Sequence, residues 1–386
     1  MMQPVHLPCY DVVILGGGPA GVAAGIELKK FDRALRVLLV EAEMLADWHV
    51  GETLAPGARQ LLEGLGCWEE VARNGVLESV QTMACWGSDR PHANEFMLST
   101  RGNAWHLDRA AFNETLRSAA EAAGVLISRA TRFEGAEQAK DGQWRLTLNC
   151  HDRPLAVAAD FVVDATGRSA KFAAALGHRP CFADRLVGVA AIVRLREKTS
   201  PDHATLVEAR ENGWWYSSPV PGEKLVLVWM SDADIVHGDG FARREHWLAH
   251  LRAAPATSAR ALKAEVPDRI TTWSARSHCF DTVCGPRWVA VGDAASSWDP
   301  LSSAGILKAL RTGKLGAFAV LDAIRGVEGG FAKYRRIISA EYARYQQDRR
   351  DVYRMEQRWR RSPFWQRRHQ DEQIEEPIAL RQSGGR

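Results

Sequence analysis

The sequence has no long hydrophobic run, no paired cysteines and no low-complexity stretch. No uncharged apolar segment approaches the ~18 residues of a membrane-spanning helix, so we expect no membrane span and no membrane partner. The seven cysteines are dispersed without a C-x-x-C pair, and the N-terminus lacks the basic and then apolar order of a secretory signal. These features predict reduced thiols in a cytoplasmic protein.

A strong excess of charge is also missing, because the 386 residues carry a net charge of only +3. Basic residues gather instead in a helical, aromatic segment from 334 to 369. No nucleic-acid-binding motif accompanies these arginines, so we expect no nucleic-acid partner. We also expect no metal site. The composition, 46% hydrophobic and 25% charged, is that of an ordinary globular protein.

The N-terminal part has the order of a nucleotide-binding βαβ unit. A short apolar run at 12–15 predicts a buried strand, and a G-x-G-x-x-G turn follows at 16–21. A helical pattern then leads to a second apolar strand at 36–40, which ends in Glu41. Glu41 lies twenty residues after the last glycine of the motif, where an acidic side chain accepts hydrogen bonds from a ribose diol.

Each residue of the glycine motif has a physical task. Gly16 makes the tight turn, Gly18 lets backbone amides approach a pyrophosphate, and Gly21 lets the helix pack close to the strand. Pro19 and Ala20 complete the motif at the start of the helix, whose free N–H groups and positive dipole end suit an anion.

Two later strands end in short polar turns. Asp164-Ala165-Thr166-Gly167 closes one buried apolar strand, and Gly292-Asp293 closes another. An acidic side chain at such a strand end can accept hydrogen bonds from the hydroxyl groups of a polyol chain. The two turns therefore favour FAD over NAD, which the glycine motif alone does not decide.

With these motifs, Val50-Gly51-Glu52-Thr53 and Asp108-Arg109, the chain resembles the superfamily of FAD-dependent monooxygenases and halogenases over most of residues 1–325. The resemblance implies a Rossmann-like α/β fold, with Asp293 on the ribityl chain of FAD and Arg109 near the pyrophosphate or adenosine side. Arg109 alternatively forms a surface salt bridge. A loop at 298–306 would run beside the isoalloxazine ring. The implied FAD-binding residues are Gly16, Gly18, Pro19, Ala20, Gly21, Glu41, Glu52, Thr53, Arg109, Asp164, Gly167, Gly292, Asp293, Pro300 and Gly305.

The pattern of strands and helices divides the chain into three parts. The expected parts are an FAD-binding domain at 1–80, 105–180 and 280–325, an inserted antiparallel β-sheet substrate domain at 81–104 and 181–279, and a helical C-terminal extension at 326–386. No second dinucleotide-binding motif is found, so NAD(P)H would reduce the flavin either directly or through a separate reductase.

Three departures from the halogenase pattern argue against halogenation. No lysine occurs between Lys30 and Lys140, where halogenases carry one, and Ser302 replaces the glutamate of the loop beside the flavin. The Trp-x-Trp-x-Ile-Pro motif of halogenases corresponds to residues 214–219, in which Tyr216 replaces the second tryptophan and Ser218 replaces the isoleucine.

Oxygen insertion into an aromatic ring, with O2 as co-substrate, is the reaction that remains. Trp214, Trp215 and Tyr216 are candidates for an aromatic wall around the ring, although the same residues also suit the core of the inserted sheet. Alternation along a strand would put Trp214 and Tyr216 on one face. His49 is a candidate proton acceptor or a structural loop residue, and Ser302 completes the candidate catalytic set.

The C-terminal segment resembles the end of flavoproteins that mature quinone-containing amine and amino-acid oxidases, at 356–369, and residues 213–219 are also similar to theirs. Those relatives hydroxylate a tryptophan side chain of a partner polypeptide. The basic helix would then dock an acidic polypeptide. Alternatively, it packs on the FAD-binding domain through Tyr342, Tyr345 and Tyr353, which share one helical face.

We therefore predict an FAD-dependent monooxygenase that hydroxylates an electron-rich aromatic ring. The preferred substrate is a tryptophan side chain of a partner polypeptide during quinone cofactor maturation, and a small aromatic molecule is the alternative. The competing hypotheses are a flavin-dependent halogenase, a flavoprotein reductase of double bonds, and a non-catalytic maturation chaperone.

Overall fold

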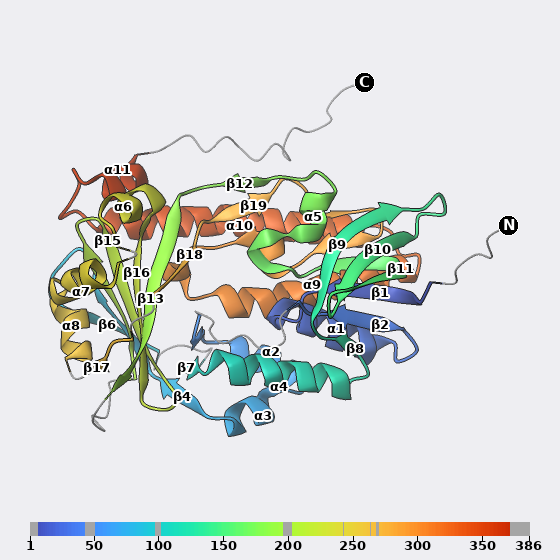
Figure 1. Ribbon diagram of the computed structural model, residues 1–386, viewed down its shortest axis with the longest axis horizontal. Coiled ribbons are helices and arrows are strands. Elements are labelled where there is room, and N and C mark those ends of the chain that lie inside the picture. Colours follow the sequence, from blue (N-terminus) through green and yellow to red (C-terminus); the bar gives the residue numbers. More distant parts are fainter. Residues whose placement is uncertain are drawn as a thin grey trace.

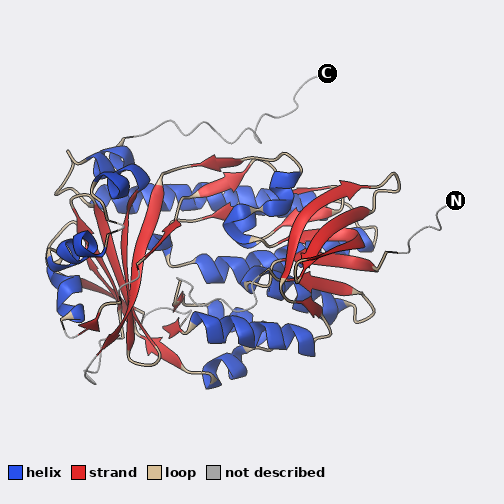
Figure 2. Ribbon diagram, viewed as in Figure 1, coloured by secondary structure: helices blue, strands red, loops and turns tan. Residues whose placement is uncertain are grey.

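The computed structural model describes residues 7–42, 51–96, 102–195, 203–241, 243–262, 264–267 and 270–370. Two large β-sheets lie at opposite ends of the molecule, and long helices run between them (Figure 1). Helices also cover the far side of the sheet on the left of Figure 2.

The first sheet has eight strands, and its central strands are parallel. Along the main path, the order is β20 (Cys284–Gly285), β21 (Trp288–Ala290), β11 (Arg153–Asp164), β1 (Cys9–Leu15), β2 (Val37–Val40) and β8 (Leu126–Ser128), while β10 (Trp144–Cys150) and β9 (Thr131–Gln138) extend from β11 as antiparallel strands. Residues 12–15 of β1 are fully buried, as is typical of a central strand in a parallel sheet.

Helix α1 (Pro19–Phe31) follows β1 directly and packs against α9 (Gly305–Ile324). The two helices approach closely at Gly313, where an added Cβ would lie 2.2 Å from the backbone oxygen of Ala20. The predicted Rossmann-like α/β fold is confirmed, including the order of strand, glycine turn, helix and strand at the N-terminus.

The second sheet also has eight strands and is mainly antiparallel. Its strands, along the path, are β17 (Ala264–Glu265), β13 (Leu186–Leu195), β16 (Lys224–Asp232), β15 (Gly213–Val220), β14 (Thr205–Arg210), β5 (Gln81–Cys85) and β6 (His92–Glu95), with β18 (Thr271–Ser274) paired to β13. Helices α6 (Ala233–Gly238), α7 (Arg244–Arg252) and α8 (Pro255–Ala261) lie between β16 and β17 in the chain. Trp247 of α7 packs on Trp215 and so covers the outer face.

Smaller elements join the two sheets. One three-stranded sheet consists of β3 (Thr53–Leu54), β7 (Ala104–Leu107) and β4 (Val76–Ser79), and another of β12 (Pro180–Phe182), β19 (His278–Phe280) and β22 (Ser296–Ser297). The remaining helices before the C-terminal part are α2 (Ala58–Leu65), α3 (Trp68–Arg73), α4 (Arg109–Ala122) and α5 (Lys171–Ala175). Short 3-10 turns occupy Gly167–Ser169, Gly292–Ala294 and Pro300–Ser302.

The C-terminal part forms α10 (Gly330–Met355) and the short α11 (Pro363–His369). The tyrosines 342, 345 and 353 are buried, as the packing alternative predicts, but they do not all pack on the first domain. Tyr353 instead joins Trp86, Trp214 and Trp365 beside the second sheet, so that α10 connects both ends of the molecule. Among the described residues, no helix combines the length and apolar character needed to traverse a bilayer.

Candidate functional site

A cavity of about 570 Å³ lies between the start of α1, the inner side of the second sheet and the loop before α9. The predicted site residues that line it are Gly18, Pro19, Ala20, Thr53, Arg109, Gly167, Tyr216, Gly292, Asp293, Pro300, Ser302 and Gly305. Met230, Thr271 and Trp273 line it as well and were not predicted. They come from β16 and β18, and no motif marks them in the sequence.

The glycine turn opens onto one end of the cavity. Gly16 has a φ of +112°, and an added Cβ there would lie 2.3 Å from the backbone oxygen of Ala165, so only glycine fits. A Cβ on Gly21 would lie 2.0 Å from the backbone oxygen of Gly16. Gly18 differs from both, because an added Cβ there meets no atom within 4 Å. Gly16 and Gly21 therefore shape the turn, while Gly18 leaves space for a ligand at the N-terminus of α1.

Glu41 lies beside this turn, at the end of β2. Its Oε2 accepts a hydrogen bond of 2.8 Å from the backbone N–H of Gly17. The carboxylate is thus held next to the glycine motif, as the spacing in the sequence predicts, although it is not part of the cavity lining.

Asp293 lines the cavity and is paired with a buried lysine that is not part of the lining. Lys308 of α9 is 1% exposed and places its Nζ 2.7 Å from Asp293 Oδ1, and Arg168 Nε lies 3.5 Å from Asp293 Oδ2. Burial alone would raise the pKa of Asp293, but the two cations outweigh it and hold that pKa below its ordinary value. The sequence reasoning missed Lys308, and its one signal was a lysine within the apolar run 306–310.

Asp164, which is predicted to contact the cofactor, is not part of the cavity lining. Asp164 is fully buried, and its carboxylate accepts hydrogen bonds from the N–H and hydroxyl of Thr166 and from the N–H groups of Phe172 and Ala173. All of its accepting capacity is directed at the protein. Asp164 therefore fixes the turn that brings Gly167, which has a φ of +66°, to the cavity wall.

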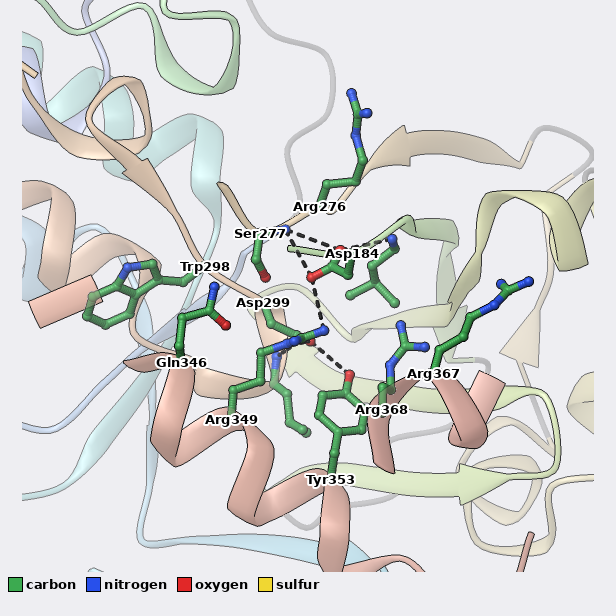
Figure 3. A network of polar contacts seen from close by, with 12 residues as sticks. Asp184, Arg276, Ser277, Trp298, Asp299, Gln346, Arg349, Tyr353, Arg367 and Arg368 are labelled. Carbon is green, nitrogen blue, oxygen red and sulfur yellow. Dashed lines mark hydrogen bonds and ion pairs between the residues drawn. The ribbon is translucent and has the colours of Figure 1, made fainter. Parts of the chain in front are cut away.

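The loop before α9 forms another wall. Gly305, Pro300 and Ser302 face the cavity, and an added Cβ on Gly305 would meet no atom within 4 Å. The Ser302 hydroxyl donates to the backbone oxygen of Asp299 at 2.9 Å, so it is tied to its own turn. Figure 3 shows how Asp299 is held in turn by Arg349 and Tyr353 of α10.

The aromatic-wall hypothesis is corrected at two of its three residues. Trp214 and Trp215 are both 0% exposed and do not line the cavity. As predicted, Trp214 and Tyr216 share one face of β15 and Trp215 lies on the other, but Trp214 packs on Trp86 and Tyr353 instead of a ligand space. Only Tyr216 reaches the cavity, because the tryptophans fill the cores on the two sides of the strand.

Polar residues surround Tyr216 at the edge of the cavity. Its hydroxyl lies 2.9 Å from Thr53 Oγ1 and donates to Glu52 Oε2 at 3.4 Å. Burial raises the pKa of Glu52 to about 7. Arg109 donates to the backbone oxygen of Gly51 at 2.8 Å, and its positive charge opposes this rise. His49 lies outside the described residues.

These features fit FAD. The open backbone at Gly18 suits the pyrophosphate, Glu41 suits the adenosine ribose, and Asp293 lies between them and the loop at 300–305. The remaining space, between this loop and Tyr216, Met230 and Trp273, is bounded by largely apolar walls.

Comparisons with known proteins agree with this geometry. A family model described as FAD binding domain matches residues 9–327. The chain is 31% identical over 366 residues to the putative FAD-dependent oxidoreductase LodB of Marinomonas mediterranea, covering 93% of this chain and 97% of that protein. It is also 25% identical over 336 residues to the tryptophan 2-halogenase of Chondromyces crocatus, covering 82% and 62%, respectively.

Solved structures share the fold. The myxobacterial chondrochloren halogenase CndH superposes with a TM-score of 0.86 at 22% identity, covering 94% of this chain and 86% of that one. The peptidyl tryptophan dihydroxylase QhpG superposes with a TM-score of 0.75 at 23% identity, covering 93% and 78%. The predicted resemblance is confirmed: the chain belongs to the FAD-binding domain family and is a flavin-dependent oxidoreductase.

Proposed function

We propose that this oxidoreductase inserts oxygen from O2 into an electron-rich aromatic ring, preferably the indole of a tryptophan in a partner polypeptide during quinone cofactor maturation. The observation that carries the proposal is the chemistry of Tyr216 and Ser218. These residues stand where the halogenase motif has tryptophan and isoleucine, and both contribute hydroxyl groups to a buried polar cluster at the cavity edge. A hydroxylation has to remove a proton from the ring carbon, which such a cluster can support.

When bound and reduced, by NAD(P)H directly or through a separate reductase, FAD supplies the activation of O2. The residues of this chain have other tasks. The glycine turn and Asp293 hold the cofactor, and the loop at 300–305 faces its reactive end. Met230 and Trp273 exclude water from the ring, and Tyr216 offers a hydroxyl at the reacting position.

The name of one similar protein supports the choice of a tryptophan residue as substrate, and that of another supports only the class of enzyme. QhpG is described as a peptidyl tryptophan dihydroxylase essential for tryptophylquinone cofactor biogenesis, and its chain shares this fold. LodB, over nearly its whole length, is similar in sequence and is described as an FAD-dependent oxidoreductase. Since most of the other relatives are halogenases, halogenation is the reaction that a test must separate from hydroxylation.

Only part of the basic C-terminal segment is suited to dock an acidic polypeptide. Much of the positive charge of the C-terminal segment is already paired within the molecule. The arginines in such pairs are Arg349 with Asp184 and Asp299, Arg358 with Glu356, and Arg367 and Arg368 with Asp232. An acidic partner would therefore contact exposed residues of α10 such as Arg335 and Arg336, and not the segment as a whole.

The proposal is tested by supplying the FAD-loaded protein with NADH, a flavin reductase and a tryptophan-bearing peptide, with and without bromide. We expect the peptide to gain the mass of oxygen at its indole in both samples, with isotopically heavy O2 as the source. A product that contains bromine and requires bromide would show a halogenase instead. A product formed equally well without O2 would show a reductase, and a peptide that binds but stays unchanged would show a chaperone.

A further inference from the structure

A buried series of polar side chains leads away from the cavity, and no sequence motif predicts this series. Thr53 and Tyr216 line the cavity, and their hydroxyl oxygens are 2.9 Å apart. Thr53 Oγ1 lies 3.3 Å from Nδ1 of His106, which is 0% exposed. Thr53 and His106 are direct register partners on β3 and β7, so the fold of this small sheet sets their distance.

The surroundings of His106 determine which ring nitrogen accepts a proton. Its Nε2 lies 2.7 Å from the backbone oxygen of His203. Because a carbonyl oxygen only accepts hydrogen bonds, Nε2 carries the hydrogen, and Nδ1 of the neutral ring is the acceptor. Nδ1 therefore faces the hydroxyls, on the side of the cavity.

Two hydroxyls approach this nitrogen. Ser218 Oγ lies 2.9 Å from Nδ1, closer than Thr53 Oγ1, but Ser218 also has the backbone oxygen of Pro219 within 3.4 Å as a second acceptor. Ser218 does not line the cavity, whereas Thr53 does. Thr53 also lies 2.9 Å from the Tyr216 hydroxyl, and Ser218 is a second neighbour of Tyr216 outside the cavity lining.

We propose that Tyr216, Thr53 and His106 form a proton relay that accepts the proton leaving the oxygenated ring carbon. The proposal rests on the function proposed above. In the relay the Tyr216 hydroxyl turns its hydrogen from Glu52 to Thr53, whose oxygen lies 2.9 Å away. Tyr216 takes the proton from the ring as it gives its own to Thr53, and Thr53 passes its proton to Nδ1 of His106. One proton moves from substrate to imidazole, the ring keeps the electron pair of the broken C–H bond, and both hydroxyls end as they began.

The groups around the relay suit this role. The imidazolium that forms donates from Nε2 to the backbone oxygen of His203, and from Nδ1 to a hydroxyl. Among the described residues, the ionisable groups near the relay include Glu52, whose Oε2 lies 3.4 Å from the Tyr216 hydroxyl, and Arg109, which lies beside Glu52. In its ionised form, the Glu52 carboxylate offsets the new positive charge of the imidazolium.

The same contacts would also arise in a network that only holds β3, β7 and β15 together. A structural network and a proton relay respond differently to the removal of one hydroxyl group. A structural network tolerates a side chain of the same shape that packs well, whereas a relay stops when its middle hydroxyl is lost, even if the fold and FAD binding are intact.

The test compares Thr53→Val with Thr53→Ser. Thr205→Val is the matched control, because it removes a hydroxyl 3.2 Å from Thr53 Oγ1 on a residue that does not line the cavity. Each FAD-loaded variant receives NADH, a flavin reductase and a tryptophan-bearing peptide, and hydroxylated product is measured against pH and in heavy water. We expect Thr53→Val to lower the rate of product formation about a hundredfold, Thr53→Ser to restore it, and Thr205→Val to keep it.

Equal rates for Thr53→Val and the parent protein would overturn the relay and leave the proposed function standing. Equal losses for Thr53→Val and Thr53→Ser would do the same, because they would show a role in packing. A relay also predicts that the parent protein slows in heavy water and that Thr53→Val loses this dependence. If the parent protein gives no hydroxylated peptide, the proposed function itself is wrong.

Discussion

Arg349 on α10 places its Nε 3.3 Å from Oδ2 of Asp299, in the loop that lines the cofactor cavity. Its Nη2 also lies 3.0 Å from Asp184, just before the second sheet begins. All three side chains are nearly buried, and Figure 3 shows the guanidinium between the two carboxylates. One arginine therefore joins the C-terminal helix, the cavity loop and the second sheet.

Replacing this arginine with methionine leaves two buried carboxylates without their cation. We expect Arg349→Met to lower the free energy of unfolding by about 3–5 kcal/mol and to weaken FAD binding, because the loop at 300–305 loses its support. Denaturant titration and flavin fluorescence measure the two effects. Arg344→Met is the control, since the Arg344 side chain is 83% exposed and its loss should change stability by less than ~1 kcal/mol. Equal effects of the two substitutions would contradict the account.

The pair of Asp293 and Lys308 separates cofactor binding from stability. Asp293→Asn removes the anion that compensates a buried lysine, so both the stability of the apo protein and its affinity for FAD should fall, the latter at least about tenfold (~1.4 kcal/mol). Adding Lys308→Met removes the uncompensated charge and should restore stability but not FAD affinity. Scanning and titration calorimetry of the single and double variants measure the stability and the FAD affinity, respectively. A double variant that recovers both properties would show that Asp293 acts only as the partner of the lysine.

Glu52 makes the stability of the apo protein depend on pH. Burial raises its pKa from 4.5 to about 7, so between these values the folded protein keeps a proton that the unfolded chain has lost. The free energy of unfolding should fall as pH rises through this window, by up to about 3 kcal/mol above pH 7. Below the pKa of Glu52 in the unfolded chain, Glu52 should cause no further change with pH. Urea titrations across this range should give a flatter profile for Glu52→Gln than for the parent protein. The exposed Glu63→Gln should leave the profile unchanged, and an equally steep profile for Glu52→Gln would refute the assignment.

Two glycines of one motif should respond differently to alanine. At Gly21 an added Cβ would clash with the backbone oxygen of Gly16, so Gly21→Ala should destabilise the apo protein by more than ~2 kcal/mol. At Gly18 the Cβ enters open space with an ordinary backbone φ of −74°, so stability should stay within about 0.5 kcal/mol. The same methyl group occupies the space assigned to the pyrophosphate, so Gly18→Ala should weaken FAD binding. Unaltered FAD affinity would place the cofactor elsewhere.

The sequence predicted the parts of the site that depend on local chain geometry. The glycine turn, Glu41 beside it and Asp293 at a strand end follow from strand, turn and helix order, which a single stretch of sequence contains. The separation of Trp214 and Tyr216 from Trp215 also follows from the alternation of a strand.

Most of the errors and omissions concern contacts between distant segments, and Asp164 is the exception, because its partners lie within nine residues. Whether Trp214 faces a ligand depends on Trp86 and Tyr353, which lie far from it in the chain and fill that side of the strand. Asp164 resembles a cofactor ligand in sequence, but four donors of the following turn use its oxygens. His106 and Lys308 were missed because each is a single polar residue in an apolar stretch, and only the assembled fold brings their partners to them.

The most direct test of the central claim is a single turnover in the absence of any reductase. The FAD-loaded protein is photoreduced without oxygen, mixed with a tryptophan-bearing peptide, and then given one portion of isotopically heavy O2. The account predicts that the peptide gains labelled oxygen at its indole, in an amount that approaches the amount of reduced flavin and does not change with bromide. Reoxidised flavin beside an unlabelled peptide, or a peptide brominated in place of oxygen, would contradict it.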